Sequence, residues 1–488
     1  MRIDDDLKYF EEPEFKDILA RYEAAREAGT NFYMGADELT DVAEYYSMVM
    51  HDEDRANEAI ELALEIHPSA VDPQVFRARQ FMLQGDLDKA QALCDAIEDQ
   101  SDREVLFLHA ELMMRGGNPK DAYAFLNNQV QAIDEDRDFF IYDSAYIFID
   151  YHQYELALGF ANALRDMAPD WYKTWQLHAD VLLGLGENSL ALEYIEKMLD
   201  VDPFDVESWN WRAEAYSSLG TYDKAFESTD YALAIEPDNE RALQLKAWVL
   251  MQQGNPAAAH ELYQQLQQMN PDCESHWLYD SYCMLDADQI ELATALVRHA
   301  LELSEGNSVD QQAIYEQYAQ VLSRQGDVSG ALQQLDLADQ CREDAGQLDE
   351  RLLRARVYAE NDELKNFDDE IKLLRSLHYV KVNRIDYQAA LILFDYGYFE
   401  RASKLLAAFG EPVLTPEEMK KEGFEVYSYL AYAALEMGRN EDVLHYLRKS
   451  IDMQDTHLTE LFAEKFPNVR LDELYDYVYY HIHGRWPE

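Results

Sequence analysis

Residues 206–239 read VESWNWRAEAYSSLGTYDKAFESTDYALAIEPDN. Trp209, Ala213 and Tyr216 are spaced i, i+4 and i+7, which places them on one face of a helix. The Leu-Gly pair that follows interrupts this pattern, and a second apolar pattern runs on towards Pro237. Proline cannot continue a helix and disfavours helical geometry in the residue before it. The stretch therefore predicts two helices joined by a short turn.

The same arrangement recurs along the chain with a step of 34 residues. Three series of residues keep that step, namely Pro169, Pro203, Pro237 and Pro271; Ala145, Ala179, Ala213 and Ala247; and Ala157, Ala191, Ala225 and Ala259. Alanine at two fixed positions suits places where helices approach closely and a larger side chain would clash. One helix pair cannot bury its apolar face alone, so we expect the units to stack on one another.

These units resemble tetratricopeptide repeats. The residues that fall on the family's signature are Trp209, Ala213, Tyr216, Gly220, Tyr222, Ala225, Ala232 and Pro237. Twelve candidate units begin at Asp37, Val71, Arg103, Asp138, Tyr172, Val206, Glu240, Glu274, Gln312, Leu348, Asn383 and Phe424. The resemblance implies an all-α fold, a right-handed superhelical α-solenoid of about twelve helix-turn-helix repeats with helical caps.

The spacing of the units also predicts how the chain is divided. We expect a capping helix within residues 1–36, a regular array of eight repeats over 37–307, about four divergent repeats over 308–455, and capping helices within 456–488. Caps with one polar face would cover the ends of the stack. The longest insertion, residues 410–423, reads GEPVLTPEEMKKEG. We expect it to form a surface loop, and a flexible break in the array is the alternative.

Charge is the outstanding feature of the composition. The 488 residues include 41 basic and 96 acidic ones, which gives a formal net charge of −55. Such a chain would repel phosphate backbones and anionic lipids, so we expect neither nucleic acid nor a membrane as a partner. We expect no signal peptide at the acidic start and no membrane span. The four cysteines are scattered without a CxxC pair, which favours a reducing, cytoplasmic location.

The sequence contains no arrangement that predicts catalysis, a metal site or a cofactor. Gly184-Leu-Gly186 resembles the start of a phosphate-binding loop, but it follows a predicted helix and not the strand that such a loop requires. His481 and His483 could form a metal-binding pair, although two solvated histidines are the simpler interpretation. We therefore expect a protein that is not an enzyme and that holds neither metal nor cofactor.

The resemblance to tetratricopeptide repeats also implies where a ligand binds. In that family one stripe of each first helix lines a concave groove that holds extended peptides. Carried over to this sequence, the stripe places aromatic residues in the groove at Phe107, Phe139, Tyr142, Tyr146, Trp248, Tyr282 and Tyr387. It places polar or charged residues there at Lys173, Asp180, Glu207, Asn210, Glu214, Arg241, Arg324 and Arg356. Packing between helices is the alternative role for each of them.

The expected function is that of a non-catalytic scaffold or adaptor, which binds a protein or peptide segment in this groove. A basic partner is one option, and a ligand with basic residues at one end and acidic residues at the other would match the order of the groove charges. The first alternative is a co-chaperone or regulator of one folded client, although Glu207 and Glu214, which follow Lys173, would repel an acidic chaperone tail. An enzyme built on helical repeats is a more remote alternative. Self-association through Tyr475, Tyr477, Tyr479 and Tyr480 stays open without a positive indication.

Overall fold

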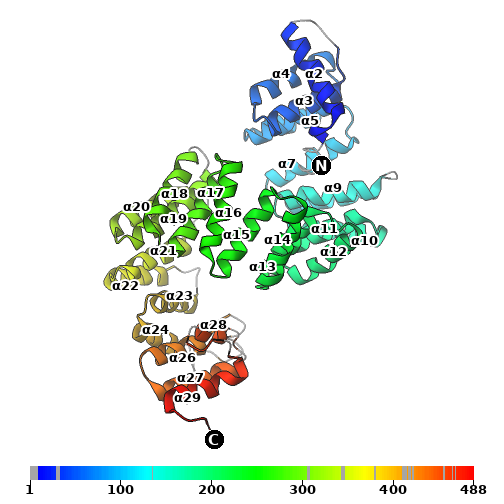
Figure 1. Ribbon diagram of the computed structural model, residues 1–488. Helices are drawn as coiled ribbons and strands as arrows, with labels where there is room; N and C mark the ends of the chain where they lie inside the picture. Colours follow the sequence, from blue (N-terminus) through cyan, green and yellow to red (C-terminus); the bar gives the residue numbers. More distant parts are fainter. Residues whose placement is uncertain are drawn as a thin grey trace. The chain divides into compact units, whose positions relative to one another are not determined.

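The computed structural model of the protein is helical, and no strand occurs among the residues that it describes (Figure 1). These are residues 9–28, 33–133, 136–304, 308–341, 347–377, 381–408, 415, 419, 423–453, 455, 457–463, 465–467 and 469–487.

The helices follow one another in consecutive pairs along the described residues. After α2 (Pro13–Ala28) come α3 (Ala36–Met48) and α4 (Glu53–Ile66), α5 (Val71–Leu83) and α6 (Leu87–Ala96), α7 (Arg103–Arg115) and α8 (Pro119–Val130), α9 (Arg137–Asp150) and α10 (Tyr154–Met167), α11 (Tyr172–Gly184) and α12 (Asn188–Val201), and α13 (Val206–Ser218) and α14 (Tyr222–Ile235). They continue with α15 (Glu240–Gln252) and α16 (Pro256–Met269), α17 (Glu274–Asp286) and α18 (Ile290–Leu303), α19 (Ser308–Arg324) and α20 (Val328–Gln340), α21 (Gln347–Glu360) and α22 (Leu364–Arg375), α23 (Val382–Asp395) and α24 (Phe399–Ala407), and α26 (Val426–Glu436) and α27 (Asn440–Asp452). The last helices are α28 (His457–Ala463) and α29 (Leu471–His483).

The prediction of an all-α solenoid of helix pairs is confirmed. The predicted starts at Val71, Arg103, Tyr172 and Val206 are the first residues of α5, α7, α11 and α13. The largest deviation is at α19, which begins at Ser308, four residues before the predicted start.

The chain forms two compact units, residues 1–249 and residues 250–488. Within each unit the two helices of a pair pack together, and each pair packs on the next. The predicted boundary between regular and divergent repeats at 307/308 concerns sequence regularity and stays a prediction. The predicted surface loop over 410–423 lies outside the described residues, apart from positions 415, 419 and 423.

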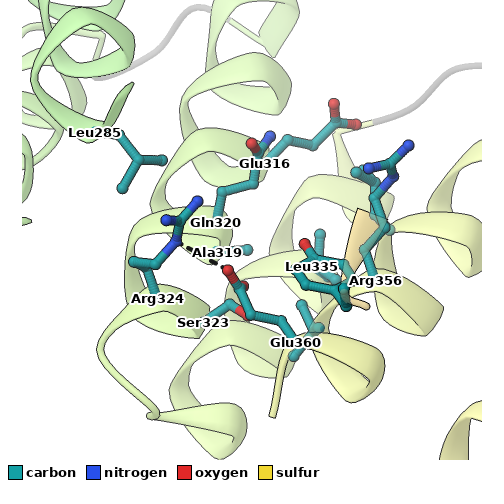
Figure 2. A pocket seen from close by; sticks show the side chains of 12 residues that line it. Leu285, Glu316, Ala319, Gln320, Ser323, Arg324, Leu335, Arg356 and Glu360 are labelled. Carbon is teal, nitrogen blue, oxygen red and sulfur yellow. Dashed lines mark hydrogen bonds and ion pairs between the residues drawn. The ribbon is translucent and has the colours of Figure 1, made fainter. Parts of the chain in front are cut away.

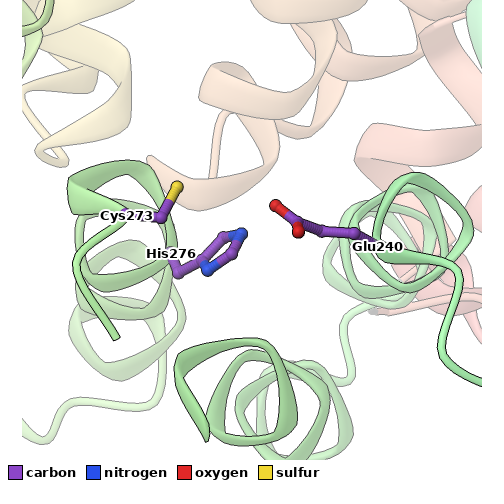
Figure 3. Close-up of side chains that lie close together, drawn as sticks. All are labelled: Glu240, Cys273 and His276. Atoms are coloured by element: carbon purple, nitrogen blue, oxygen red, sulfur yellow. The ribbon is translucent and has the colours of Figure 1, made fainter. Parts of the chain in front are cut away.

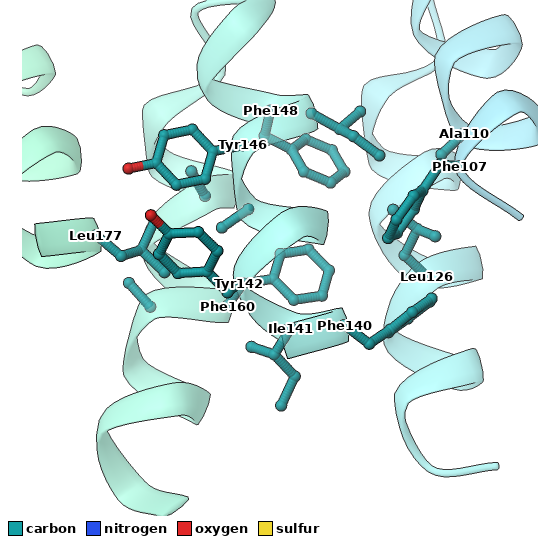
Figure 4. Packing of buried hydrophobic residues seen from close by; sticks show 14 of the residues in the cluster. Phe107, Ala110, Leu126, Phe140, Ile141, Tyr142, Tyr146, Phe148, Phe160 and Leu177 are labelled. Carbon is teal, nitrogen blue, oxygen red and sulfur yellow. The ribbon is translucent and has the colours of Figure 1, made fainter. Parts of the chain in front are cut away.

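Small and large side chains alternate in the core of the first unit. Figure 4 shows the cluster built from α7, α8, α9, α10 and α11, in which Ala110 lies among aromatic rings. The rings of Phe148 and Phe160 stack with their centroids 5.6 Å apart. Ala145 and Ala157, which belong to the two alanine series, are completely buried. The alanine periodicity thus marks the places where neighbouring helices touch, as the sequence predicts.

The periodic prolines have a second role besides ending a repeat. In three repeats the indole N–H of a tryptophan donates a hydrogen bond to the carbonyl oxygen of the proline six residues earlier. The pairs are Trp175 with Pro169 at 2.8 Å, Trp209 with Pro203 at 2.9 Å and Trp277 with Pro271 at 3.0 Å. Each bond fixes the turn against the first helix of the following repeat.

The close contact between Gly184 and the ring of Tyr154 allows a test of how tightly neighbouring helices pack. A Cβ atom at Gly184 would lie 2.2 Å from Cε1 of Tyr154, whereas the same position of other repeats carries Ser218 or Asp286. The ring of Tyr154 occupies the space that those side chains fill elsewhere. We expect Gly184→Ala to lower the free energy of unfolding by about 1–2 kcal/mol, because overpacking displaces the ring.

The control is the double variant with Tyr154→Ala. Removing the ring should make Gly184→Ala neutral or stabilising, since alanine favours the helix over glycine. Thermal unfolding of the four proteins of this double-mutant cycle measures the coupling. Equal effects of Gly184→Ala with and without the ring would contradict the packing argument.

Helix α2 packs on the first repeat of the described chain, and α28 and α29 pack on the last one. Phe15 and Tyr22 of α2 are buried against α3, and Leu474 and Val478 of α29 are buried against the last repeat. The predicted division of the chain into capping segments and repeat arrays stays a prediction. Among the described residues, none of the helices combines the length and the apolar character that crossing a membrane requires.

Candidate functional site

The most distinctive surface feature of the first unit is a cavity of about 450 Å³ on the first helices of the first four repeats. Helices α3, α5, α7 and α9 contribute its walls. Eight carboxylates line it, those of Asp37, Asp41, Glu44, Asp72, Glu104, Glu111, Asp143 and Asp150. We call this feature the acidic cavity. Its apolar lining includes Val75, Phe76, Phe107, Tyr146 and Ile147, so it offers both charge and an apolar surface.

Three carboxyl groups of the acidic cavity have pKa values above the ordinary value of aspartate. Burial is the main cause for Asp41, Asp72 and Asp150. Neighbouring acids add to it, for example Glu104 near Asp72, because like charges disfavour ionisation. A cation placed in the cavity would relieve this repulsion.

Arg79 is the one cationic side chain among the described residues that line the acidic cavity. Its Nε and Nη2 atoms donate to the two oxygens of Glu111 at 3.1 Å and 2.8 Å. Nη2 also donates to Glu104 at 3.1 Å. Burial alone would lower the pKa of Arg79, but the charges of Glu111 and Glu104 outweigh it and raise that pKa. The guanidinium therefore stays charged and bridges α5 to α7.

Gln80 lies next to Arg79 and also lines the acidic cavity. Its side chain is 5% exposed, and its Oε1 accepts a hydrogen bond from Arg77 at 3.1 Å. Its Nε2 has no acceptor among the described residues. Since buried amide donors are nearly always paired in proteins, a carbonyl oxygen of a bound segment is a fitting acceptor.

The structure places four of the predicted groove aromatics in the core. Phe107, Tyr142, Tyr146 and Tyr387 are each less than 8% exposed, and Figure 4 shows the first three inside the cluster described above. The hydroxyl of Tyr142 donates to Gln176, 34 residues later, at 2.9 Å. This side chain reaches the next first helix, which is why it is covered. Phe107 and Tyr146 keep an edge on the acidic cavity.

The other predicted aromatics are more accessible. Phe139 and Trp248 are 39% and 40% exposed, and Tyr282 is partly buried. Burial raises the pKa of Tyr282 to about 12. Lys173 lies over the rings of Phe139 and Tyr142, with Nζ 5.6 Å and 4.7 Å from their centroids. This cation is thus held on an aromatic surface.

The predicted acids of α13 are already engaged within the protein. Arg241 forms ion pairs with both Glu207 and Glu214, the latter at 2.8 Å. Asn210 is completely buried, and its amide donates to Asn239 at 3.2 Å. A third predicted acid, Asp180 on α11, is partly buried.

Arg324 and Arg356 come together in the second unit. They line a cavity of about 250 Å³ formed by α17, α19, α20 and α21 and by Tyr396, which directly follows α23 (Figure 2). Arg324 pairs with Glu360 at 2.9 Å, and Arg356 pairs with Asp395 at 3.4 Å. Because both arginines have internal acidic partners, this cavity presents no excess of positive charge to an acidic ligand.

Cys273 and His276 lie at the beginning of α17 in the second unit (Figure 3). The third residue labelled in Figure 3, Glu240, begins α15 in the first unit. The three residues do not belong to one unit, and we assign no metal site to them.

Sequence comparison supports the assignment of the repeats. Residues 177–240 and 216–279 each match a family model described as tetratricopeptide repeat. No curated relative matches the sequence. Similar solved structures include a tetratricopeptide repeat protein from Parabacteroides merdae ATCC 43184, at 16% identity and a TM-score of 0.43, covering 52% of this chain and 98% of that one.

Two further structures are similar over shorter parts of this chain. PilW, a type IV pilus biogenesis factor, is 20% identical with a TM-score of 0.38, covering 43% of this chain and 94% of its own. YrrB, a tetratricopeptide repeat protein with an unusual peptide-binding site, is 16% identical with a TM-score of 0.30, covering 38% of this chain and 93% of its own. The family models and the consecutive helix pairs agree: residues 177–279 of the chain are tetratricopeptide repeats.

Proposed function

We propose that this protein is a non-catalytic scaffold that binds a protein or peptide segment in the acidic cavity. The segment carries lysine or arginine side chains next to apolar ones. The observation that supports this proposal is the composition of the cavity lining, which combines eight carboxylates and one arginine with apolar side chains. A basic segment is complementary to it in charge, and the apolar side chains provide anchoring contacts.

The internal pairing of the other groove charges favours the same partner. Arg241, Arg324 and Arg356 each have acidic partners in a neighbouring helix. The arginines that were expected to attract the acidic end of a two-ended ligand are therefore already paired within the protein. Only the basic end of such a ligand keeps a complementary surface. Lys173 is the basic residue that an acidic chaperone tail would contact, and its ammonium group lies over the ring of Tyr142. No contact described above therefore supports the co-chaperone alternative.

Binding of a labelled basic peptide to the full chain tests the proposal. The matched probe is a peptide of the same length and apolar residues in which glutamate replaces every lysine and arginine. We expect the basic peptide to bind and the acidic one not to bind, as measured by fluorescence anisotropy. Hydrogen exchange should show protection in α3, α5, α7 and α9. Binding of neither peptide, or protection confined to second helices, would overturn the proposal.

Acidification should release the basic peptide. The carboxyl groups of Asp41, Asp72 and Asp150 bind a cation only when ionised, and their pKa values in the free protein are raised. Protonation therefore begins above the ordinary aspartate value of about 3.9 as the pH falls. We expect the affinity for the basic peptide to fall as the pH is lowered from neutral, and the loss to begin above that ordinary value.

Unfolding does not account for this release. A group whose pKa is raised in the folded state destabilises the fold when ionised, so protonation of these three groups on acidification stabilises the protein. Circular dichroism at each pH provides the control. An affinity that stays constant down to about pH 4 would show that these carboxylates do not contact the ligand.

A further inference from the structure

We propose that Arg79 is a built-in competitor for the basic side chain of the ligand, because it occupies the carboxylates of Glu104 and Glu111 that a ligand cation would use. The inference rests on the proposed function and adds to it the chemical group that is recognised, a guanidinium or ammonium group. It also names the residue that sets the affinity.

Arg79 contacts Glu104 and Glu111 in the way in which an arginine side chain of a bound ligand would contact them. The guanidinium binds both oxygens of Glu111 side by side and reaches one oxygen of Glu104. Paired, parallel hydrogen bonds of this kind are the preferred way in which proteins bind an arginine side chain. Arg79 is 35% exposed, and Glu104 is 41% exposed. Glu111 is 18% exposed, so the contact of Arg79 with Glu104 is the more open side, at which an entering side chain would compete first.

Charge in the acidic cavity is far from balanced by Arg79. Arg79 is the one cation in a lining with eight carboxylates, of which Asp143 is paired with Arg103 outside the lining, and burial of Asp41 and Asp72 disfavours their negative charges and raises their pKa. A second cation is favoured there, but it enters beside Arg79 and is repelled by it. The ligand cation must either displace Arg79 from its two glutamates or accept that repulsion. Both routes predict that Arg79 weakens binding.

Arg79→Met in the full chain tests the inference, with the labelled basic peptide as the probe. We expect the variant to bind the peptide about tenfold more tightly than the wild type, equivalent to ~1.4 kcal/mol. Arg79→Lys keeps the charge but loses the paired hydrogen bonds, so its affinity should lie between the two. Arg241→Met is the matched control, because it also removes an arginine that bridges two glutamates of the first unit but lies outside the acidic cavity.

A second measurement covers the case in which Arg79→Met does not fold. In the wild type, the Nε–H resonance of Arg79 should move towards that of a solvent-exposed arginine when the peptide is added. If the peptide binds and the resonance stays unchanged, the ligand does not displace Arg79 from Glu104 and Glu111. Unchanged or weaker binding by a folded Arg79→Met protein would overturn the competitor role itself.

The outcomes separate this inference from the proposed function. If the wild type binds the basic peptide and Arg79→Met binds no better, the function stands and the role of Arg79 is wrong. If only Arg79→Met binds, Arg79 does compete with the ligand cation, but the proposed function of the wild type fails for this peptide. If neither protein binds, both proposals fail.

Discussion

Neutralising three carboxylates of the acidic cavity should weaken binding of the basic peptide about 100-fold. The change is Asp41→Asn with Asp72→Asn and Asp150→Asn, which keeps the size of each side chain. All three groups line the cavity and come from α3, α5 and α9. An ion pair at a partly exposed site contributes up to about 1 kcal/mol, so three of them amount to ~3 kcal/mol and about two powers of ten in Kd. Anisotropy titration at about 0.15 M salt, where the Debye length is about 8 Å, measures the effect.

The same triple variant should not be less stable than the wild type. Burial raises the pKa values of Asp41, Asp72 and Asp150 in the folded protein. Their ionised forms therefore cost stability at neutral pH, and the neutral amides remove that cost. A fall in affinity together with an equal or higher unfolding temperature distinguishes loss of a binding contact from loss of the fold.

The matched control removes three negative charges from second helices. Asp88, Asp121 and Glu155 are exposed on α6, α8 and α10 and do not line the cavity. Replacing them by Asn, Asn and Gln changes the net charge by the same amount, and salt screens their effect over the intervening distance. We expect less than about a threefold change. Equal losses in both triple variants would mean that the peptide responds to the total charge and not to the acidic cavity.

The sequence predicts the helix pairs well because their determinants are local and periodic. Pro203 and Pro237 end two repeats, and Ala213 and Ala225 mark helix contacts, all readable from the 34-residue step. The start of α19 is predicted four residues too late, because Ser308 keeps the 34-residue step from Glu274 and the extra residues lengthen α19 itself, which has 17 residues against 13 in α17.

The acidic cavity could not be located in the same way. Asp41, Asp72 and Glu104 occupy predicted groove positions of their repeats, but the charge of the stripe averaged over all repeats matches the rest of the chain. Asp143 and Asp150 lie beside the predicted stripe and reach the cavity only through the way α9 packs. Tyr142 shows the opposite case, since it lies on the stripe but is covered by the neighbouring helix. Position along a helix is encoded locally, whereas accessibility depends on how neighbouring helices pack.

Asp280→Ala should be among the most destabilising single changes in the second unit. Asp280 of α17 is completely buried. Its carboxylate contacts Nδ1 of His260 at 2.5 Å and accepts a hydrogen bond from Gln267 at 2.9 Å, both from α16. Alanine would leave two polar groups without their partner, which costs about 3 kcal/mol. Asp280→Asn keeps an acceptor for Gln267 and should cost about 1 kcal/mol. Hydrogen exchange of α16 and α17 in the full chain measures the local opening free energy.

The dependence of stability on pH distinguishes the effect of the charge of Asp280 from the effect of its size and hydrogen bonds. Burial raises the pKa of Asp280, and the hydrogen bonds with His260 and Gln267 offset this only in part. With a folded pKa above the unfolded value of about 3.9, this group destabilises the fold at neutral pH, and protonation removes the penalty as the pH falls. The wild type should therefore gain stability relative to Asp280→Asn on acidification. A constant difference between the two proteins down to about pH 4 would mean that the carboxyl is already protonated or that its burial carries no electrostatic cost.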